Sequence, residues 1–178
     1  AILVNLSLNG LMGYFLALDV VEDRRAALVG GTVFATSGYL LAQVLGGHLN
    51  LLAIWPLPLA ILLLRRAYRQ PAYTSIILAG GALAFTLLAD WQYFLFALLW
   101  AAWYCLWLLI SMGKTAHLRP LFPIIAAVGL ALLLASPLII ATAQVAAATP
   151  NVETQGGQDF RREQSVDLAD LLIPSQLH

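Results

Sequence analysis

Long apolar stretches alternate with short polar breaks along this chain. A helix needs about 20 mostly apolar residues to cross a bilayer, and roughly 17 to 25 are tolerated. Runs this long, without alternation of polar and apolar residues, do not suit a barrel strand. The pattern therefore predicts an all-α, polytopic transmembrane helical bundle of about six spans, over residues 2–18, 26–45, 48–64, 73–89, 91–110 and 121–145.

The segment after residue 145 has a different pattern. Residues 146–165 are rich in polar residues, Pro and Gly, which predicts a loop. Ser165 can cap a short amphipathic helix over 166–173, and Pro174 would end it. We therefore expect a transmembrane domain over 1–145 and a tail over 146–178 whose short helix lies along the membrane surface.

Basic residues concentrate in alternate polar breaks. The first, third and fifth breaks hold seven of the nine Lys and Arg residues, namely Arg24, Arg25, Arg65, Arg66, Arg69, Lys114 and Arg119. The second break, 46–50, and the fourth, 90–92, hold none. This is the positive-inside pattern. It predicts a multi-pass protein of the bacterial inner (cytoplasmic) membrane, with the Arg-rich loops in the cytoplasm and both termini outside.

Composition supports a membrane protein and narrows its partners. The chain is 61% hydrophobic and only 10% charged, and its mean hydropathy is +0.85. Its formal net charge is zero, so no basic field favours nucleic acid. Membrane lipid is the expected partner. Cys105 is the single cysteine, which excludes an internal disulfide.

Small and polar residues within the spans predict close helix packing. Gly31 and Ala35, and likewise Gly80 and Ala84, lie four residues apart, a spacing that lets helix backbones approach. Asn5 and Asn9 share a face of the first span, where we expect interhelical hydrogen bonds. Trp100, Trp103, Tyr104 and Trp107 recur at helical spacing and predict a bulky face against lipid or another helix.

The outer breaks contain the residues most suited to chemistry. Asp90 is acidic, lies near the bilayer and is not beside a basic loop, which makes it a candidate functional residue. The alternative is a solvated Asp in a turn flanked by aromatic anchors. His48 follows two glycines that permit a sharp reversal, and it can act as acid, base or hydrogen-bond donor, or it is a surface or capping residue.

The third span contains the sequence Trp55-Pro56-Leu57-Pro58. Each proline removes a backbone donor, so we expect these residues to break the helix. Such a break either lines a cavity or merely kinks the helix for packing. The chain has no P-loop, GxGxxG, HExxH or CxxC motif, which gives no support to nucleotide hydrolysis, dinucleotide redox or familiar zinc chemistry.

Several of these segments together resemble a block of bacterial GT-C-type membrane glycosyltransferases and the related YfhO-like proteins. The resemblance covers nearly all of the chain, in the stretches 34–39, 47–50, 55–59, 90–94 and 165–177. It implies transfer of a sugar from a polyprenyl-phosphate carrier at the outer membrane face. No cofactor is required by the sequence, although the family's use of acidic residues as base or metal ligand allows a divalent metal.

The resemblance also implies roles for individual residues. Asp90 and His48 would be catalytic candidates, and substrate contacts would come from Asn50, Trp55, Trp91, Gln92 and Tyr93. The acidic loop that follows the family's first span would lie upstream of Ala1. We therefore expect an internal piece of a longer polypeptide that does not catalyse transfer alone.

A different class of function is compatible with the same pattern. Small-residue seams and a Trp-rich span suit a non-catalytic structural or accessory subunit of a larger respiratory or photosynthetic membrane complex, packed against other subunits or pigments. A transporter module is a weaker alternative, supported only by the proline-bearing span.

The orientation can be tested by labelling from one side of intact vesicles. A membrane-impermeant reagent should reach residue 48 from the outside and residue 66 from the cytoplasmic side only, because the Arg-bearing breaks are expected in the cytoplasm. Equal accessibility of both positions would contradict the predicted topology.

Overall fold

The protein is described by a computed structural model over residues 2–46, 49–112 and 121–148. Every regular element within these ranges is helical, and no strand occurs among them, which confirms the all-α prediction. The chain divides into two compact units, 1–137 and 138–178. All packing described below belongs to the first unit. The predicted helix 166–173 and most of the predicted tail lie outside the described residues.

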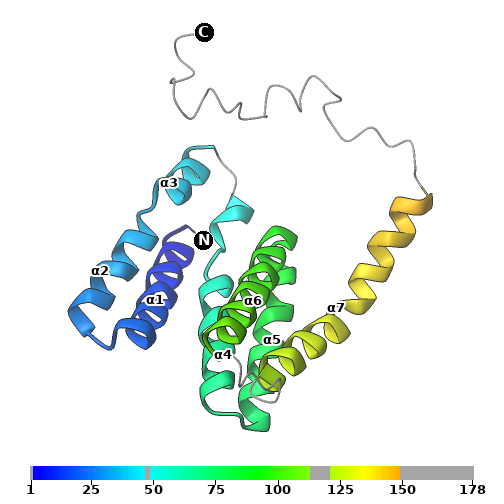
Figure 1. Cartoon of the computed structure of the whole chain (residues 1–178). Coiled ribbons are helices and arrows are strands. Elements are labelled where there is room, and N and C mark those ends of the chain that lie inside the picture. The colour runs from blue at the N-terminus through cyan, green and yellow to red at the C-terminus, as the bar shows by residue number, and fades with distance from the viewer. Residues whose placement is uncertain (1, 47–48, 113–120, 149–178) are drawn as a thin grey trace. The chain divides into compact units, whose positions relative to one another are not determined.

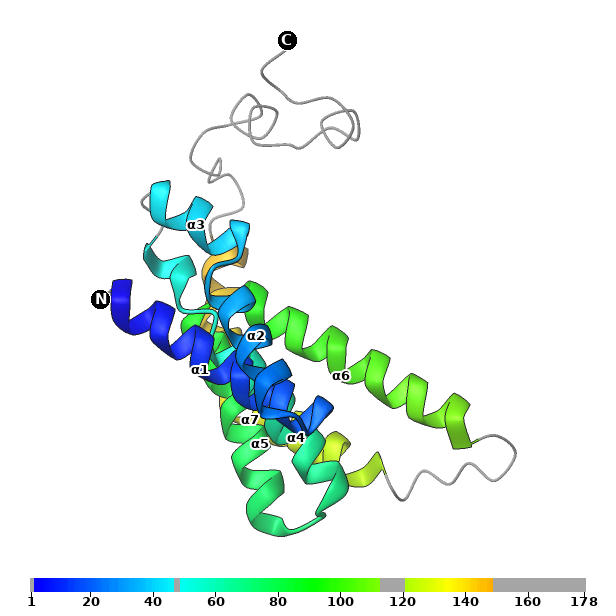
Figure 2. The ribbon, with the colours of Figure 1, turned by 90° about the vertical axis from the view of Figure 1, so that its left-hand side faces the viewer.

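The first three helices are α1 (Ile2–Val21), α2 (Arg24–Ala35) and α3 (Gly38–Leu45). α1 and α2 lie side by side in both views (Figures 1 and 2). Their turn is built from charged residues. Glu22 takes a left-handed conformation, with φ 59°, after α1 ends. The side chain of Asp23 then caps α2 by accepting a hydrogen bond from the backbone N–H of Ala26, at 2.7 Å.

Glycines bring helices close together at two places, and one of them is the contact between α1 and α2. A Cβ atom added at Gly31 would lie 2.6 Å from the carbonyl oxygen of Gly10, and one added at Gly80 would lie 2.8 Å from the side chain of Leu130. These distances are shorter than van der Waals contact, so only glycine fits at either position without a shift. The predicted seams at Gly31 and Gly80 are therefore confirmed as packing sites within the chain itself.

The predicted span over 48–64 needs correction. The structure has a short 3₁₀ helix, η1 (Leu49–Leu52), followed by α4 (Pro56–Arg69), which has 14 residues. Pro56 and Pro58 lie in the first turn of α4, where backbone N–H groups have no partner within the helix. The prolines therefore begin this helix and do not break it. The irregular backbone lies before them, at Ala53 and Ile54.

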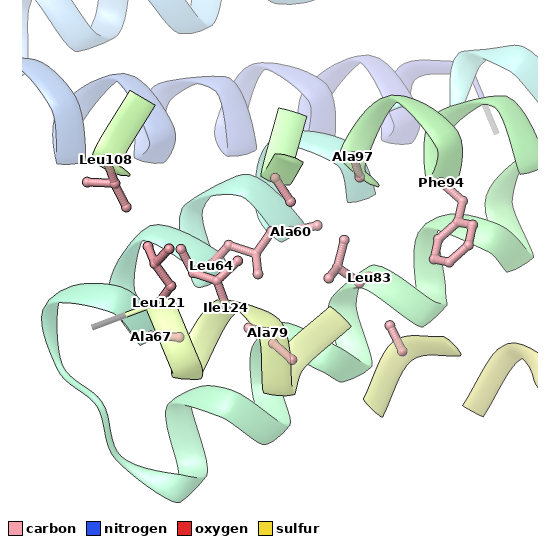
Figure 3. Packing of buried hydrophobic residues seen from close by; sticks show 13 residues of the cluster. Ala60, Leu64, Ala67, Ala79, Leu83, Phe94, Ala97, Leu108, Leu121 and Ile124 are labelled. Atoms are coloured by element: carbon pink, nitrogen blue, oxygen red, sulfur yellow. The ribbon is translucent and has the colours of Figure 1, made fainter. Parts of the chain in front are cut away.

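The remaining helices form a core with α4. They are α5 (Tyr73–Ala89), α6 (Trp91–Met112) and α7 (Phe122–Ala148). Buried residues from all four helices converge in Figure 3, and small residues are frequent among them: Ala60, Ala67, Ala79, Ala97, Ala101, Ala127 and Ala131. Small side chains permit close helix approach where there is little hydrophobic drive between helices in lipid.

Four segments are long and apolar enough to cross a membrane, by length and composition: Ile2–Val21, Arg24–Leu45, Trp91–Ser111 and Phe122–Val145. The second comprises α2 and α3 and is interrupted as an α-helix at Thr36 and Ser37. α5 coincides with the predicted range 73–89 but has only 17 residues. These helices indicate a multi-pass membrane protein with four candidate spans. A crossing by α4 or α5 stays a prediction.

α7 contains an internal proline that the helix accommodates locally. Pro137 cannot donate to the carbonyl of Leu133, four residues earlier, because it has no backbone N–H. The hydroxyl of Ser136 donates to that carbonyl instead, at 2.7 Å. A membrane helix needs such a replacement because lipid offers no hydrogen bonds to a freed carbonyl.

The close contact at Gly31 predicts a stability effect. Gly31→Ala should lower the free energy of unfolding by about 1–3 kcal/mol, because the added methyl meets the backbone of α1 and cannot be relieved by a side-chain rotation. Thermal unfolding of the purified protein in detergent micelles measures this. Gly81→Ala is the matched control, since a Cβ there meets nothing within 4 Å. Equal midpoints for the two variants would contradict the proposed seam.

Candidate functional site

The two outer turns predicted to hold the site meet through one tyrosine. Tyr93 lies in the first turn of α6 and is only 1% exposed. Its hydroxyl donates a hydrogen bond to the backbone carbonyl of Leu51 in η1, at 2.6 Å. η1 also contains Asn50. The residues that directly follow the second and fourth polar breaks, 42 apart in sequence at this bond, therefore come together at one end of the helices.

A second phenol extends this contact. The hydroxyls of Tyr39, on α3, and Tyr93 are 3.1 Å apart. Because the proton of Tyr93 is directed to Leu51, Tyr39 donates to the oxygen of Tyr93. The resulting chain of two hydrogen bonds joins α3, α6 and η1. Sequence reasoning placed no role on Tyr39, because its hydrogen bond joins residues 54 apart in sequence, which a local pattern does not reveal.

Asn9 supports the same turn from α1. Its side chain is 0% exposed, and its Nδ2 atom donates to the carbonyl of Leu52 at 2.9 Å. This confirms the predicted interhelical hydrogen bond for Asn9. Its Oδ1 atom is buried and has no hydrogen-bond partner within the part of the chain that the structure describes. Two consecutive carbonyls of η1 are thus held by two buried side chains from different helices.

Asp90 occupies the N-cap position of α6. Its backbone is extended, and its Oδ1 atom accepts a hydrogen bond from the backbone N–H of Gln92 at 2.7 Å. The carboxylate also carries a negative charge at the positive end of the α6 dipole. Asp90 is half-buried. A structural role for Asp90 is therefore established, and a carboxylate has a second oxygen left for another partner.

The other predicted site residues are not all gathered at this point. Trp91 and Gln92 are exposed at the beginning of α6, while Tyr93 is buried. Trp55 packs its ring against Phe85 at the end of α5, with centroids 5.4 Å apart. His48 and the side chain of Asn50 lie outside the described residues. The structure thus joins the turns without defining a complete substrate site.

Two cavities lie away from this junction. One, of about 450 Å³, is lined by residues of α1 and α2 that include Ser7 and Thr32. Another, of about 330 Å³, is lined by residues of α6 and α7 that include Cys105. No residue of α4 lines either of them, so the expected cavity wall at Trp55 and Pro56 stays a prediction. The described ranges contain no group of three or more His, Cys, Asp or Glu side chains suited to a metal.

Charged residues gather at the opposite end of the helices. Asp19, near the end of α1, lies 2.9 Å from Nε of Arg65 and 3.4 Å from Nη1 of Arg69, both on α4. Nε of Arg66 lies 3.9 Å away. The Arg65 guanidinium also lies over the ring of Tyr104, 5.9 Å from its centroid. The first and third breaks therefore meet at one end, as alternation along a bundle requires.

The aromatic face predicted on α6 divides into two parts. Trp100, Tyr104 and Trp107 stack along the helix, with centroids 4.9 and 5.9 Å apart, and Tyr104 also contacts Tyr68 of α4. Trp103 is 70% exposed and lies outside this stack. Trp100 and Tyr104 pack against the core of the bundle, whereas Trp103 and the end of the stack at Trp107, which is 53% exposed, face outward.

Comparisons with known proteins give no assignment. No family model, curated protein or solved structure matches this chain.

The hydrogen bond from Tyr93 predicts a cost when its hydroxyl is removed. Tyr93→Phe should lower the free energy of unfolding by about 1–3 kcal/mol, because the Leu51 carbonyl loses its donor in a site that water does not readily enter. Denaturant or thermal unfolding in micelles measures the effect. Tyr39→Phe, which removes only the phenol–phenol bond, should cost less. A larger loss for Tyr39→Phe would contradict the central position of Tyr93.

Proposed function

We propose that this chain is part of a membrane glycosyltransferase of the GT-C type, which transfers a sugar from a polyprenyl-phosphate carrier at the outer face of the bacterial inner membrane. The observation that carries the proposal is the hydrogen bond between Tyr93 and Leu51. It joins the Asp90 turn to the turn that follows His48 in the sequence. Both turns belong to the segments that resemble the family.

The two turns have different roles in the proposed reaction. Asp90 would accept the proton of the acceptor hydroxyl while the oxygen of that hydroxyl attacks the anomeric carbon of the sugar. The bond between that carbon and the carrier phosphate would break, and the phosphate would leave with the electron pair. Donors from His48 and Asn50 would stabilise its charge. General base catalysis and such stabilisation each contribute on the order of 10² or more in rate.

The distribution of charge supports this assignment of the outer end. The ends of α1 and α4, which hold Asp19 and its three arginine neighbours, lie away from the beginning of α6, which holds Asp90 and Tyr93 (Figure 1). Arginine-rich ends favour the cytoplasm. Under the proposal, Asp90 then faces the compartment in which polyprenyl-linked sugars are used, and a divalent metal at its free oxygen is compatible with the chemistry.

A second candidate is an accessory subunit of a larger membrane complex. The outward face of α6 favours it, since Trp103 and Ile110 are each 70% exposed and need lipid, pigment or protein as cover. Gly31 and Gly80 do not test this alternative, because both are used in packing within the chain. Substitutions there would destabilise the bundle itself, so the release of a partner from such a variant would not identify an interface.

Asp90→Asn separates catalysis from structure. Asn is as good an N-cap residue as Asp, so the bond to Gln92 can be retained while the base is lost. We expect turnover of a polyprenyl-linked sugar in membranes that carry the complete protein to fall by about 10²-fold or more, with an unchanged unfolding midpoint. Transfer to the acceptor is measured with a radiolabelled carrier-linked sugar.

Asp23→Asn provides the matched control. Asp23 caps α2 through the same kind of hydrogen bond, at 2.7 Å, but lies at the opposite end of the helices. This variant should retain full turnover. Unchanged turnover in Asp90→Asn would remove Asp90 from the mechanism and favour the accessory subunit.

A further inference from the structure

We propose that Arg66 and Arg69, at the end of α4, bind the phosphate group of an anionic lipid headgroup. The charges of the cluster around Asp19 do not cancel. Three guanidinium groups surround the single carboxylate of Asp19, and the closest ion pair, with Arg65, is largely buried: the two side chains are 15% and 11% exposed. This pair is neutral, so the cluster retains two positive charges on Arg66 and Arg69.

Arg66 and Arg69 also have hydrogen-bond donors available for a ligand. Arg66 and Arg69 are 54% and 45% exposed, and they lie farther from the carboxylate, at 3.9 and 3.4 Å. Arg69 also donates from Nη1 to the backbone carbonyl of Asp19 at 3.3 Å. A guanidinium has five N–H donors in a planar fork. Most donors of both groups therefore remain for a ligand with several acceptor oxygens, which is the chemistry of a phosphate.

The position of the cluster relative to the membrane also favours this ligand. Arg66 and Arg69 are three residues apart, which places them as neighbours on the surface of α4. Asp19 lies within the last turn of α1, a helix of membrane-spanning length. The cluster is thus at the level where an apolar helix leaves the hydrocarbon and headgroups begin. Basic groups at this level attract anionic lipids. Arg66 and Arg69 are held at this level by the ends of α1 and α4.

The ligand is defined by a phosphate that carries negative charge, and two sources can supply it. A phosphodiester headgroup arrives from the membrane, and inorganic phosphate from solution. The geometry favours the lipid, because the apolar side chains of Val20 and Val21, each 54% exposed, directly follow Asp19 at the end of α1. Acyl chains attached to the headgroup would follow the adjacent helices.

Native mass spectrometry of the purified chain tests the site. The protein is transferred from mixed micelles that contain equal amounts of phosphatidylglycerol and phosphatidylcholine, and the retained lipids are counted. The wild type should retain one phosphatidylglycerol preferentially. Each arginine near a headgroup contributes roughly fivefold in affinity, so Arg66→Gln with Arg69→Gln should reduce the preference by about tenfold or more. An unchanged preference would overturn the proposal.

Arg24→Gln with Arg25→Gln is the matched control. It removes the same charge near the same end of the bundle, from exposed residues of α2 for which no ion pair to Asp19 occurs within the described ranges. The preference for phosphatidylglycerol should survive this change. An equal loss in both double variants would overturn a defined site in favour of a general positive field.

Two further measurements separate the source of the phosphate and guard against misfolding. A large excess of inorganic phosphate should leave the lipid adduct intact, and displacement of the lipid would assign the site to a soluble anion and overturn the lipid proposal. Arg66→Lys with Arg69→Lys retains both charges and should keep part of the preference, whereas its complete loss together with a lowered unfolding midpoint would show that the arginines act in folding and would overturn the site.

Discussion

The irregular backbone before α4 depends on hydrogen bonds from distant side chains. Within a bilayer, carbonyl groups outside a regular helix need partners from the protein, because lipid supplies none. Leu51 and Leu52 of η1 receive theirs from Tyr93 and Asn9, on α6 and α1. These two bonds hold the turn that follows the paired glycines. The proposed site depends on the bond of Tyr93, which joins the residues that follow the second and fourth breaks, and on the bond of Asn9, which holds the same turn from α1.

The two ends of the first unit use different interactions for the same purpose. At one end, neutral phenol and amide groups hold a backbone turn. At the other, a carboxylate holds three guanidinium groups against the end of α1. Charge at the arginine end attracts anionic headgroups, whereas the neutral end leaves Asp90 as a carboxylate without a basic neighbour in the described part of the chain. This asymmetry gives each end a separate chemistry.

Much of the fold could be predicted from hydropathy, and the exceptions have identifiable causes. The range 73–89 matched α5 because its polar flanks are clear on both sides. The range 48–64 is not one continuous helix, because Pro56 begins α4 at no cost in hydrogen bonds and the residues before it form η1 and irregular backbone. Tyr93 was named as a substrate residue from resemblance alone. Its bond to Leu51, like that of Asn9 to Leu52, joins residues far apart in sequence, which a local pattern does not reveal.

The separation between η1 and Tyr93 also constrains how the chain reaches this arrangement. Asn9 has left the ribosome before Leu52, but Tyr93 follows Leu51 by 42 residues. At typical rates of synthesis, roughly 5–20 residues per second, Tyr93 is synthesised on the order of a few seconds after Leu51. The Leu51 carbonyl lacks its donor during that time. The α1–α2 hairpin therefore assembles early, with one anchor of the turn in place. The bond between Tyr93 and Leu51 can form only after the beginning of α6 has been synthesised, so the turn closes at a late step of biogenesis.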